Sequence, residues 1–187
     1  MSKRVNLISS AVLILLLVIE VVTFKPVIVK GPGMEPAYTN GTNYLVNKLA
    51  YLFSKPERGD VISYHYTQNP QYLGVGRIIG LPGDKLKIQG GKVFVNGTLL
   101  EESYVPVNAT TQVASKSEIR DTSEGAGEIV DMSGPKIIDE GQELVIPENN
   151  FFMMGDNREQ SIDSRSLGML KSKDIIGKLT FKYKLPF

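Results

Sequence analysis

The stretch GDNREQSIDSR at residues 155–165, followed by Gly168, is the part of this sequence that decides its fold. Two shorter stretches lie upstream of it, KGPGMEP at residues 30–36 and GRIIGLPGD at residues 76–84. All three combine glycine or proline with charged or polar residues, a composition typical of turns between regular elements. We therefore expect each of them to hold polar side chains at a bend of the chain.

The composition of the whole chain excludes several kinds of chemistry. The 187 residues include 42% hydrophobic and 22% charged residues, which is ordinary for a globular domain, and about 150 residues is typical of one domain. The chain has 0 cysteines and 1 histidine, which excludes disulfides, thiolate metal sites, cysteine nucleophiles and multi-histidine metal sites. A Ser-His-Asp triad would have to use His65, which a strand pattern and two flanking tyrosines mark instead as structural or surface-exposed. A net charge of +1 gives no indication of nucleic-acid binding.

An unbroken apolar run, LISSAVLILLLVIEVVTF, occupies residues 7–24. As a helix it would span roughly 27 Å, close to the ~30 Å hydrocarbon core of a bilayer. Lys3 and Arg4 precede it, so the positive-inside rule predicts residues 1–6 on the cytoplasmic side and residues 25–187 outside. Bulky residues 21–26 stand where a cleaved signal peptide would need small ones. The run therefore predicts an uncleaved, single-pass transmembrane anchor.

Beyond the apolar run the sequence predicts a mostly β domain. Strand composition occurs at residues 27–30, 61–66, 86–88, 92–95, 98–100, 151–154 and 175–183. Asn96-Gly97 is the preferred two-residue hairpin turn. Residues 44–53 fit either a helix or a strand, and no βαβ alternation of a nucleotide-binding fold is present. Residues 108–141 are rich in Ser, Thr, Gly, Asp and Glu, and we expect them to form a long polar excursion between strands that is partly mobile.

In this order and behind an apolar segment, the three stretches resemble the bacterial type I signal peptidases of the peptidase S26 family. The third stretch is the most specific, because G-D-N-R-x-x-S-x-D-S-R fixes eight of its eleven positions. The resemblance covers nearly the whole chain and implies an extracytoplasmic β domain of the signal-peptidase, LexA-like type. It also implies a Ser-Lys dyad that cuts signal peptides from secreted proteins and needs neither cofactor nor metal.

Both residues of that dyad are absent here. The family serine directly precedes the methionine of S-M-x-P, where this chain has Gly33 before Met34 and Pro36. The family lysine directly precedes Arg77, where this chain has Gly76. Arg77 cannot replace the base, because a guanidinium stays protonated at any working pH. Losing the nucleophile removes the covalent route, and the residual catalysis of such enzymes is only ~10³–10⁴ over water.

The remaining motif positions match the family. They are Met34, Pro36, Arg77, Gly83, Asp84, Gly155, Asp156, Asn157, Arg158, Ser161, Asp163, Ser164 and Arg165. The resemblance implies that Ser161 orients the lysine, so we expect it to face a vacancy, and that Asp163 and Arg165 form a supporting ion pair. Residues 155–158 would form a turn that helps to build the core. These residues either persist because the fold needs them or retain a role in ligand binding.

Three hypotheses about function follow. The leading one is an inactive, membrane-anchored homologue on the outer face of the bacterial cytoplasmic membrane, which binds signal peptides or an active signal peptidase paralogue. The alternative is an active serine-type peptidase that uses other groups. A third, that the glycines are engineered into an active enzyme, fits less well because alanine is the usual replacement.

Overall fold

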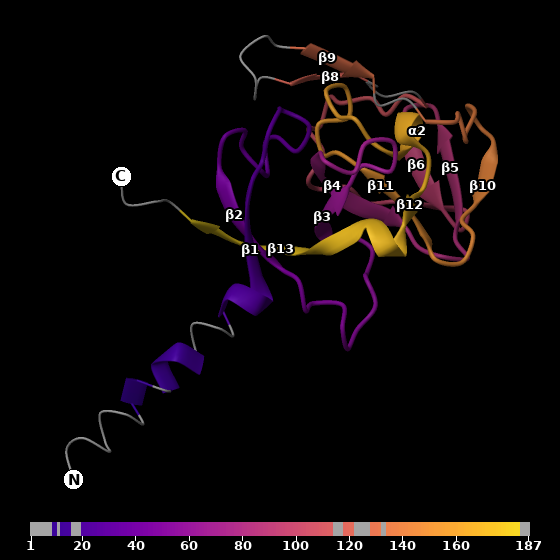
Figure 1. Cartoon of the computed structure of the whole chain (residues 1–187). Coiled ribbons are helices and arrows are strands. Elements are labelled where there is room, and N and C mark those ends of the chain that lie inside the picture. The colour runs from indigo at the N-terminus through magenta and orange to yellow at the C-terminus, as the bar shows by residue number, and fades with distance from the viewer. Residues whose placement is uncertain are drawn as a thin grey trace.

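One large antiparallel sheet carries the residues of all three sequence motifs or their flanks (Figure 1). The computed structural model describes residues 9–10, 12–15, 20–113, 118–121, 128–131 and 134–183. Within these residues, seven strands form the sheet in the order β1-β2-β13-β3-β4-β11-β12. Their bounds are β1 Phe24–Ile28, β2 Asn43–Asn47, β13 Ile175–Tyr183, β3 Val61–His65, β4 Leu73–Gly80, β11 Asn150–Met154 and β12 Leu170–Lys171.

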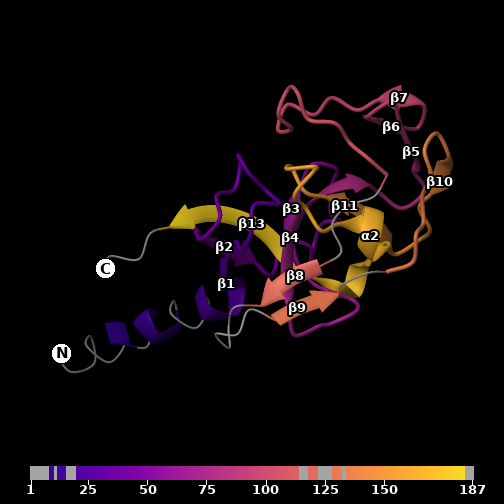
Figure 2. The same ribbon diagram turned by 90° about the horizontal axis from the view of Figure 1, so that it is seen from above.

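Two smaller sheets complete the described β structure. The first has the order β10-β5-β6-β7, with bounds β10 Glu143–Val145, β5 Lys85–Gln89, β6 Lys92–Val95 and β7 Thr98–Leu99. The second pairs β8 (Glu118–Asp121) with β9 (Glu128–Asp131). Figure 2 shows β5, β6, β7 and β10 on the side of the domain opposite to β1, β2 and β13. A short helix α2 (Ser164–Leu167) and a 3-10 turn η1 (Ser172–Asp174) lie before and after β12.

The mostly β prediction is confirmed, with differences at the boundaries. The strands expected at 61–66, 86–88, 92–95, 98–100, 151–154 and 175–183 are all present within one or two residues. Asn96 and Gly97 have φ values of 53° and 78°, as the hairpin turn between β6 and β7 requires. The first strand runs over Phe24–Ile28 and not 27–30, because it pairs with β2 along its whole length. The ambiguous residues 44–53 divide into β2 and a turn, and the polar excursion contains the β8–β9 hairpin.

Strand β4 lies between two hydrophobic cores. Ile78 packs on one face with Ile62, Tyr64 and Met153. Its neighbour Ile79 points to the other face and packs with residues of β5, β6 and β11. Successive side chains of a strand alternate between faces, so a strand buried on both sides is apolar at consecutive positions. This burial fixes the register of β4 and hence the place of Gly76 and Arg77.

The described part of the N-terminal run is helical at residues 9–10, 12–15 and 20–23. Residues 1–8, 11 and 16–19, which include the expected cytoplasmic N-terminus and part of the expected anchor, lie outside the described residues. Among the residues that are described, no helix is both long enough and apolar enough to cross a membrane. Phe24, the last residue of the expected anchor, belongs to β1.

Candidate functional site

The third motif folds into a tight loop around a buried ion pair. Asp163 caps α2, and the Arg165 Nε and Nη2 atoms lie 2.8 and 2.7 Å from its two carboxylate oxygens. Both residues are almost fully buried, at 1% and 2% exposure. Arg165 Nη2 also donates to the Arg158 carbonyl at 2.7 Å, and the Gly155 N–H donates to Asp163 at 3.1 Å. A bidentate pair with these extra donors holds the ends of the loop together.

Ser161 lies inside this network and does not face a vacancy. Its hydroxyl donates to Asp163 Oδ2 at 2.5 Å and accepts from Arg165 Nη2 at 2.8 Å. Only 3% of the residue is exposed. The serine keeps two charged hydrogen-bond partners of its own, and this is why the absence of a lysine does not leave it unsatisfied. The other motif serine, Ser164, accepts from the Met153 N–H at 3.0 Å and joins the loop to β11.

The pKa of Asp163 lies below its ordinary value of 3.8. Burial opposes the charged carboxylate, but the Arg165 guanidinium and the hydrogen bonds from Arg165, Ser161 and Gly155 outweigh it. The pKa of Asp60 is lowered as well. Burial opposes its charged carboxylate, but the hydrogen bonds from Lys178, the Glu57 N–H and Tyr51 outweigh this effect.

Acidification should therefore destabilise the fold. A carboxylate with a folded-state pKa below its unfolded one contributes stability that is fully present above about pH 4 and is lost as pH falls through the folded value. We expect the free energy of unfolding to be flat with respect to these two groups between pH 7 and 5, and to fall below about pH 4. Urea unfolding of the Asp163→Asn variant across this range provides the check, since its slope below pH 4 should be shallower than that of the unmodified chain. Equal slopes would contradict the assignment.

The segment that contains Gly33 packs directly on this loop. The Gly33 carbonyl accepts from the Asn157 N–H at 3.0 Å. A Cβ atom at residue 33 would lie 3.2 Å from Ser161 Cα and 3.4 Å from Ser161 Cβ. The next residue, Met34, is buried in a core with residues of β1, β2, β3 and β13, and Pro36 follows a cis peptide bond. A side chain at residue 33 would therefore contact Ser161 slightly closer than ordinary van der Waals distance.

Gly155 has no room for a side chain, and an alanine there should be costly. Its Cβ would lie 2.3 Å from Ser161 Cβ and 2.4 Å from the Gly33 carbonyl oxygen. We expect Gly155→Ala to lower the unfolding free energy by about 1–3 kcal/mol, as overpacking a filled core does. Gly33→Ala is the matched control, because its contacts of 3.2 and 3.4 Å need a shift of only a few tenths of an ångström. Denaturant unfolding of both variants tests this, and a loss for Gly155→Ala no larger than that for Gly33→Ala would contradict the prediction.

Gly76 lies in the centre of β4, opposite Ile62 of β3. A Cβ at this position would meet Met153 Sδ at 2.9 Å, Tyr64 Cε1 at 3.6 Å and the Met154 carbonyl at 3.7 Å. The Tyr64 ring also covers Gly74, where a Cβ would come within 2.3 Å of it. The space next to the family lysine position is therefore occupied by methionine and tyrosine side chains.

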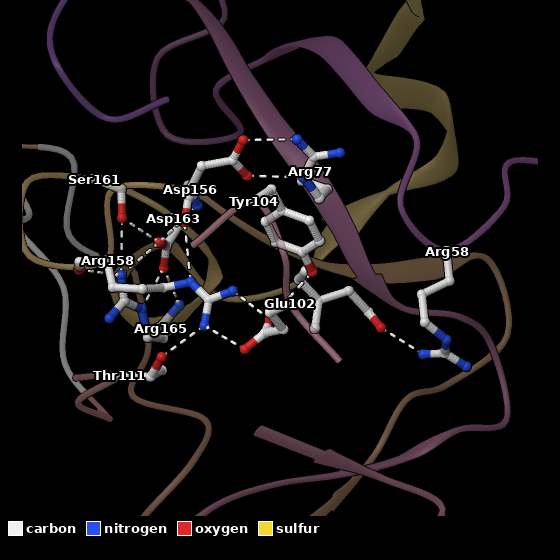
Figure 3. Close-up of polar contacts among 12 residues, drawn as sticks. Arg58, Arg77, Glu102, Tyr104, Thr111, Asp156, Arg158, Ser161, Asp163 and Arg165 are labelled. Atoms are coloured by element: carbon white, nitrogen blue, oxygen red, sulfur yellow. Dashed lines mark hydrogen bonds and ion pairs between the residues drawn. The ribbon is translucent and has the colours of Figure 1, made fainter. Parts of the chain in front are cut away.

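The two remaining motif arginines bind carboxylates near the same loop (Figure 3). Arg77 donates to both oxygens of the fully buried Asp156, at 2.8 and 2.6 Å. The Tyr104 ring lies 4.0 Å from its guanidinium carbon. Arg158 forms an ion pair with Glu102 and donates to Thr111 at 2.6 Å.

Sequence reasoning missed Glu102, Tyr104 and Thr111. They lie in the connection that follows β7, at least 47 residues from Arg158 in the chain. A Glu and a Tyr in a polar segment carry no local signal of such contacts. Through them the connection over residues 101–111 becomes part of the site.

The turn of the second motif is structural. Asp84 accepts from the Leu81 N–H at 2.6 Å, as the turn pattern predicts, and from Arg58 and Asn96 side chains at 3.0 and 2.8 Å. Gly83 has a φ of 86°, a conformation that glycine adopts without strain. These contacts join β4 to β5, beyond the C-terminal end of β4, whereas Gly76 lies in the centre of that strand.

Other groups that could replace the dyad are engaged elsewhere. The His65 Nδ1 atom lies 2.6 Å from the Pro70 carbonyl, as expected of a structural histidine on a strand. Lys48 donates to the Val21 carbonyl at 3.1 Å. Across the described part of the chain, no cluster of three or more His, Cys, Asp or Glu residues could hold a metal ion.

The comparisons with known proteins decide the family. The profile described as "Signal peptidase, peptidase S26" matches residues 2–184. The chain belongs to the signal peptidase S26 family. Signal peptidase IB of Staphylococcus aureus is 32% identical over 172 residues, which cover 91% of this chain and 83% of that protein. Signal peptidase I P of Bacillus subtilis subsp. natto is 32% identical over 166 residues, which cover 88% and 80%. The crystal structure of a signal peptidase I from Enterococcus faecalis is 29% identical, with a TM-score of 0.48, over 68% of this chain and 98% of that one.

Positions 33 and 76, in the first and second motifs, both carry glycine in this chain. The turns, buried ion pairs and packing glycines are in place around positions 33 and 76. Gly33 packs directly on the third motif, and the site presents no hydroxyl at residue 33 and no amine at residue 76.

Proposed function

We propose that this chain is a catalytically inactive homologue of type I signal peptidase, anchored by a single membrane span with its β domain outside the bacterial cytoplasmic membrane. It would bind signal peptides or an active signal peptidase. The observation that carries this proposal is the pair of glycines at positions 33 and 76 in an otherwise complete frame. A serine nucleophile needs a base, and a lysine base must be neutral when it accepts the proton. Neither group is available at the two positions.

The packing around the two glycines supports the loss of activity. Ser161 carries the hydroxyl beside Gly33, but it is buried and donates to Asp163. A carboxylate whose pKa is lowered by a bound guanidinium is a weak base, so this pair does not activate the serine. Met153 and Tyr64 fill the space next to Gly76. A substitute lysine from another segment would have to displace them.

An active peptidase is the second candidate, favoured by the 32% identity to proteins named as signal peptidases. To separate the two, the full chain in detergent is incubated with a preprotein that carries an Ala-x-Ala site. Signal peptidase IB of S. aureus serves as the positive control. We expect no cleavage above that of a mock purification from cells without the gene. Cleavage that rises with the amount of this protein and exceeds the mock preparation would overturn the proposal.

Binding is measured separately. A fluorescent signal peptide is titrated into the full chain in detergent micelles and followed by anisotropy, and a scrambled peptide is the control. Saturable binding of the signal peptide alone supports a peptide-binding role. Equal signals for both peptides, or none at high micromolar concentration, would exclude that role and leave an active signal peptidase as the proposed partner.

A further inference from the structure

The connection that follows β7 forms a closed loop at residues 102–111. One nitrogen atom joins its two ends, because Arg158 Nη1 donates to Glu102 Oε2 at 3.0 Å and to Thr111 Oγ1 at 2.6 Å. Figure 3 shows both residues on the Arg158 guanidinium. Compact surface loops whose ends lie this close are frequently functional. The third motif thus holds the loop from both ends.

The middle of this loop is exposed. The Val107 side chain is fully exposed, and Pro106 and Asn108 are exposed as well. Ala109 is half-buried, and its N–H donates to the Pro106 carbonyl at 2.9 Å in a tight turn. A single exposed valine is ordinary on a protein surface, and it becomes informative here only through its neighbours.

The exposed turn has the sequence of a signal-peptide end. Signal peptides end in an Ala-x-Ala-like sequence, in which the first and third residues are small and the cut follows the third. Val107 and Ala109 fit these two positions, with Thr110 after the cut. The other alanines beyond the apolar run do not fit, because a charged residue or glutamine stands two positions before each of Ala37, Ala50, Ala114 and Ala126.

We propose that residues 105–110 are an inhibitory loop by which this chain binds an active signal peptidase. This inference rests on the proposed function, in which the chain associates with such an enzyme. Residues i and i+2 of an extended strand point to the same side, so Val107 and Ala109 would together fill the pockets for the small residues of a signal peptide. To become extended, the segment opens the hydrogen bond between Ala109 and Pro106, while Arg158 keeps the loop ends together. A loop held in this way loses less conformational entropy on binding than a free peptide does.

The test is inhibition of S. aureus signal peptidase IB, with the preprotein as substrate and the full chain in detergent as inhibitor. We expect competitive inhibition, which raises the apparent KM for the preprotein and leaves kcat unchanged. Val107→Glu should weaken the inhibition at least about tenfold, because a pocket for a small apolar residue would have to bury an unpaired carboxylate.

Asn108→Glu is the matched control, since it adds the same charge at the neighbouring position. In an extended strand its side chain points away from the pockets, so inhibition should be kept. Both positions are exposed, and neither variant should disturb the fold. Inhibition that is lost in Val107→Glu and kept in Asn108→Glu supports the loop. An equal loss in both variants would indicate a general charge effect and overturns the proposal.

The remaining outcomes separate the loop from the proposed function. Equal inhibition by the unmodified chain and both variants would mean that the chain binds the peptidase elsewhere, so the loop is wrong and the proposed association stands. No inhibition at a large molar excess also overturns the loop, and co-purification of the two proteins then decides whether the association is wrong as well. Mass spectrometry detects a cut between Ala109 and Thr110, and extensive cleavage there would show a substrate and not an inhibitor, which overturns the proposal.

Discussion

Replacing Gly33 with serine and Gly76 with lysine in the same chain should restore signal-peptide cleavage. We expect at least about a 10³-fold increase over the unmodified chain, because nucleophile and base act as a unit and losing either costs a serine protease most of its catalysis. For the same reason, either substitution alone should remain inactive. The preprotein assay described above measures all three variants.

The packing around residue 76 indicates which third substitution should increase the cleavage rate of the double variant. A side chain at residue 76 would bring its Cβ within 2.9 Å of Met153 Sδ, whereas a serine at residue 33 needs only a small shift. Adding Met153→Ala to the double variant should therefore raise the rate again, by giving the lysine room. Gly33→Ala with Gly76→Lys is the control without a nucleophile. A folded triple variant with no cleavage would contradict the view that only the dyad has been lost.

Removal of the buried carboxylate of the third motif should have the largest effect on stability. Asp163→Ala leaves the Arg165 guanidinium, 2% exposed, without its ion-pair partner. Breaking a buried pair from one side costs about 3–5 kcal/mol, a large part of the total stability of a typical domain. Urea unfolding followed by circular dichroism measures the loss.

The chain supplies a matched control in the exposed pair of Lys136 and Asp139, whose side chains are 66% and 63% exposed. Asp139→Ala should cost less than about 1 kcal/mol. Asp163→Ala combined with Arg165→Met should be less destabilising than the sum of the two single changes, since the second removes the charge left behind by the first. Similar losses for Asp163→Ala and Asp139→Ala would contradict a structural role for the buried pair.

Strands with regular alternation could be predicted from the sequence, and β4 could not. In β5, Leu86 and Ile88 are buried and alternate with polar residues that are exposed or half-buried, which is a clear period of two. Strand β4 includes Gly74, Gly76 and Gly80, and glycine is unfavourable in strands. It is nevertheless central, because Tyr64 and Met153 fill the space that its missing side chains leave. Packing of this kind depends on residues distant in sequence and has no local pattern.

The contacts of the candidate site also include some that could be predicted from the sequence and others that could not. The turn at Asp84 follows from its short Leu-Pro-Gly-Asp sequence, and the pair of Asp163 and Arg165 was implied by the resemblance of the third stretch to the family. The contacts of Arg77 with Tyr104 and of Arg158 with Glu102 join segments far apart in the chain. The expectation that Ser161 faces a vacancy was wrong because the sequence does not reveal that Arg165 reaches its hydroxyl.

The order of strands in the large sheet has a consequence for how the protein is made. Strand β13, the last of the described strands along the chain, lies between β2 and β3 and pairs with both. Until it arrives, β1 and β2 have no hydrogen-bonded connection to β3 and β4 within the sheet. A chain that emerges N-terminus first, from a ribosome or a translocation pore, must therefore wait with two open sheet edges until β13 is free. Completion of the domain is a late step, and such unpaired edges are where a growing chain is most exposed to aggregation.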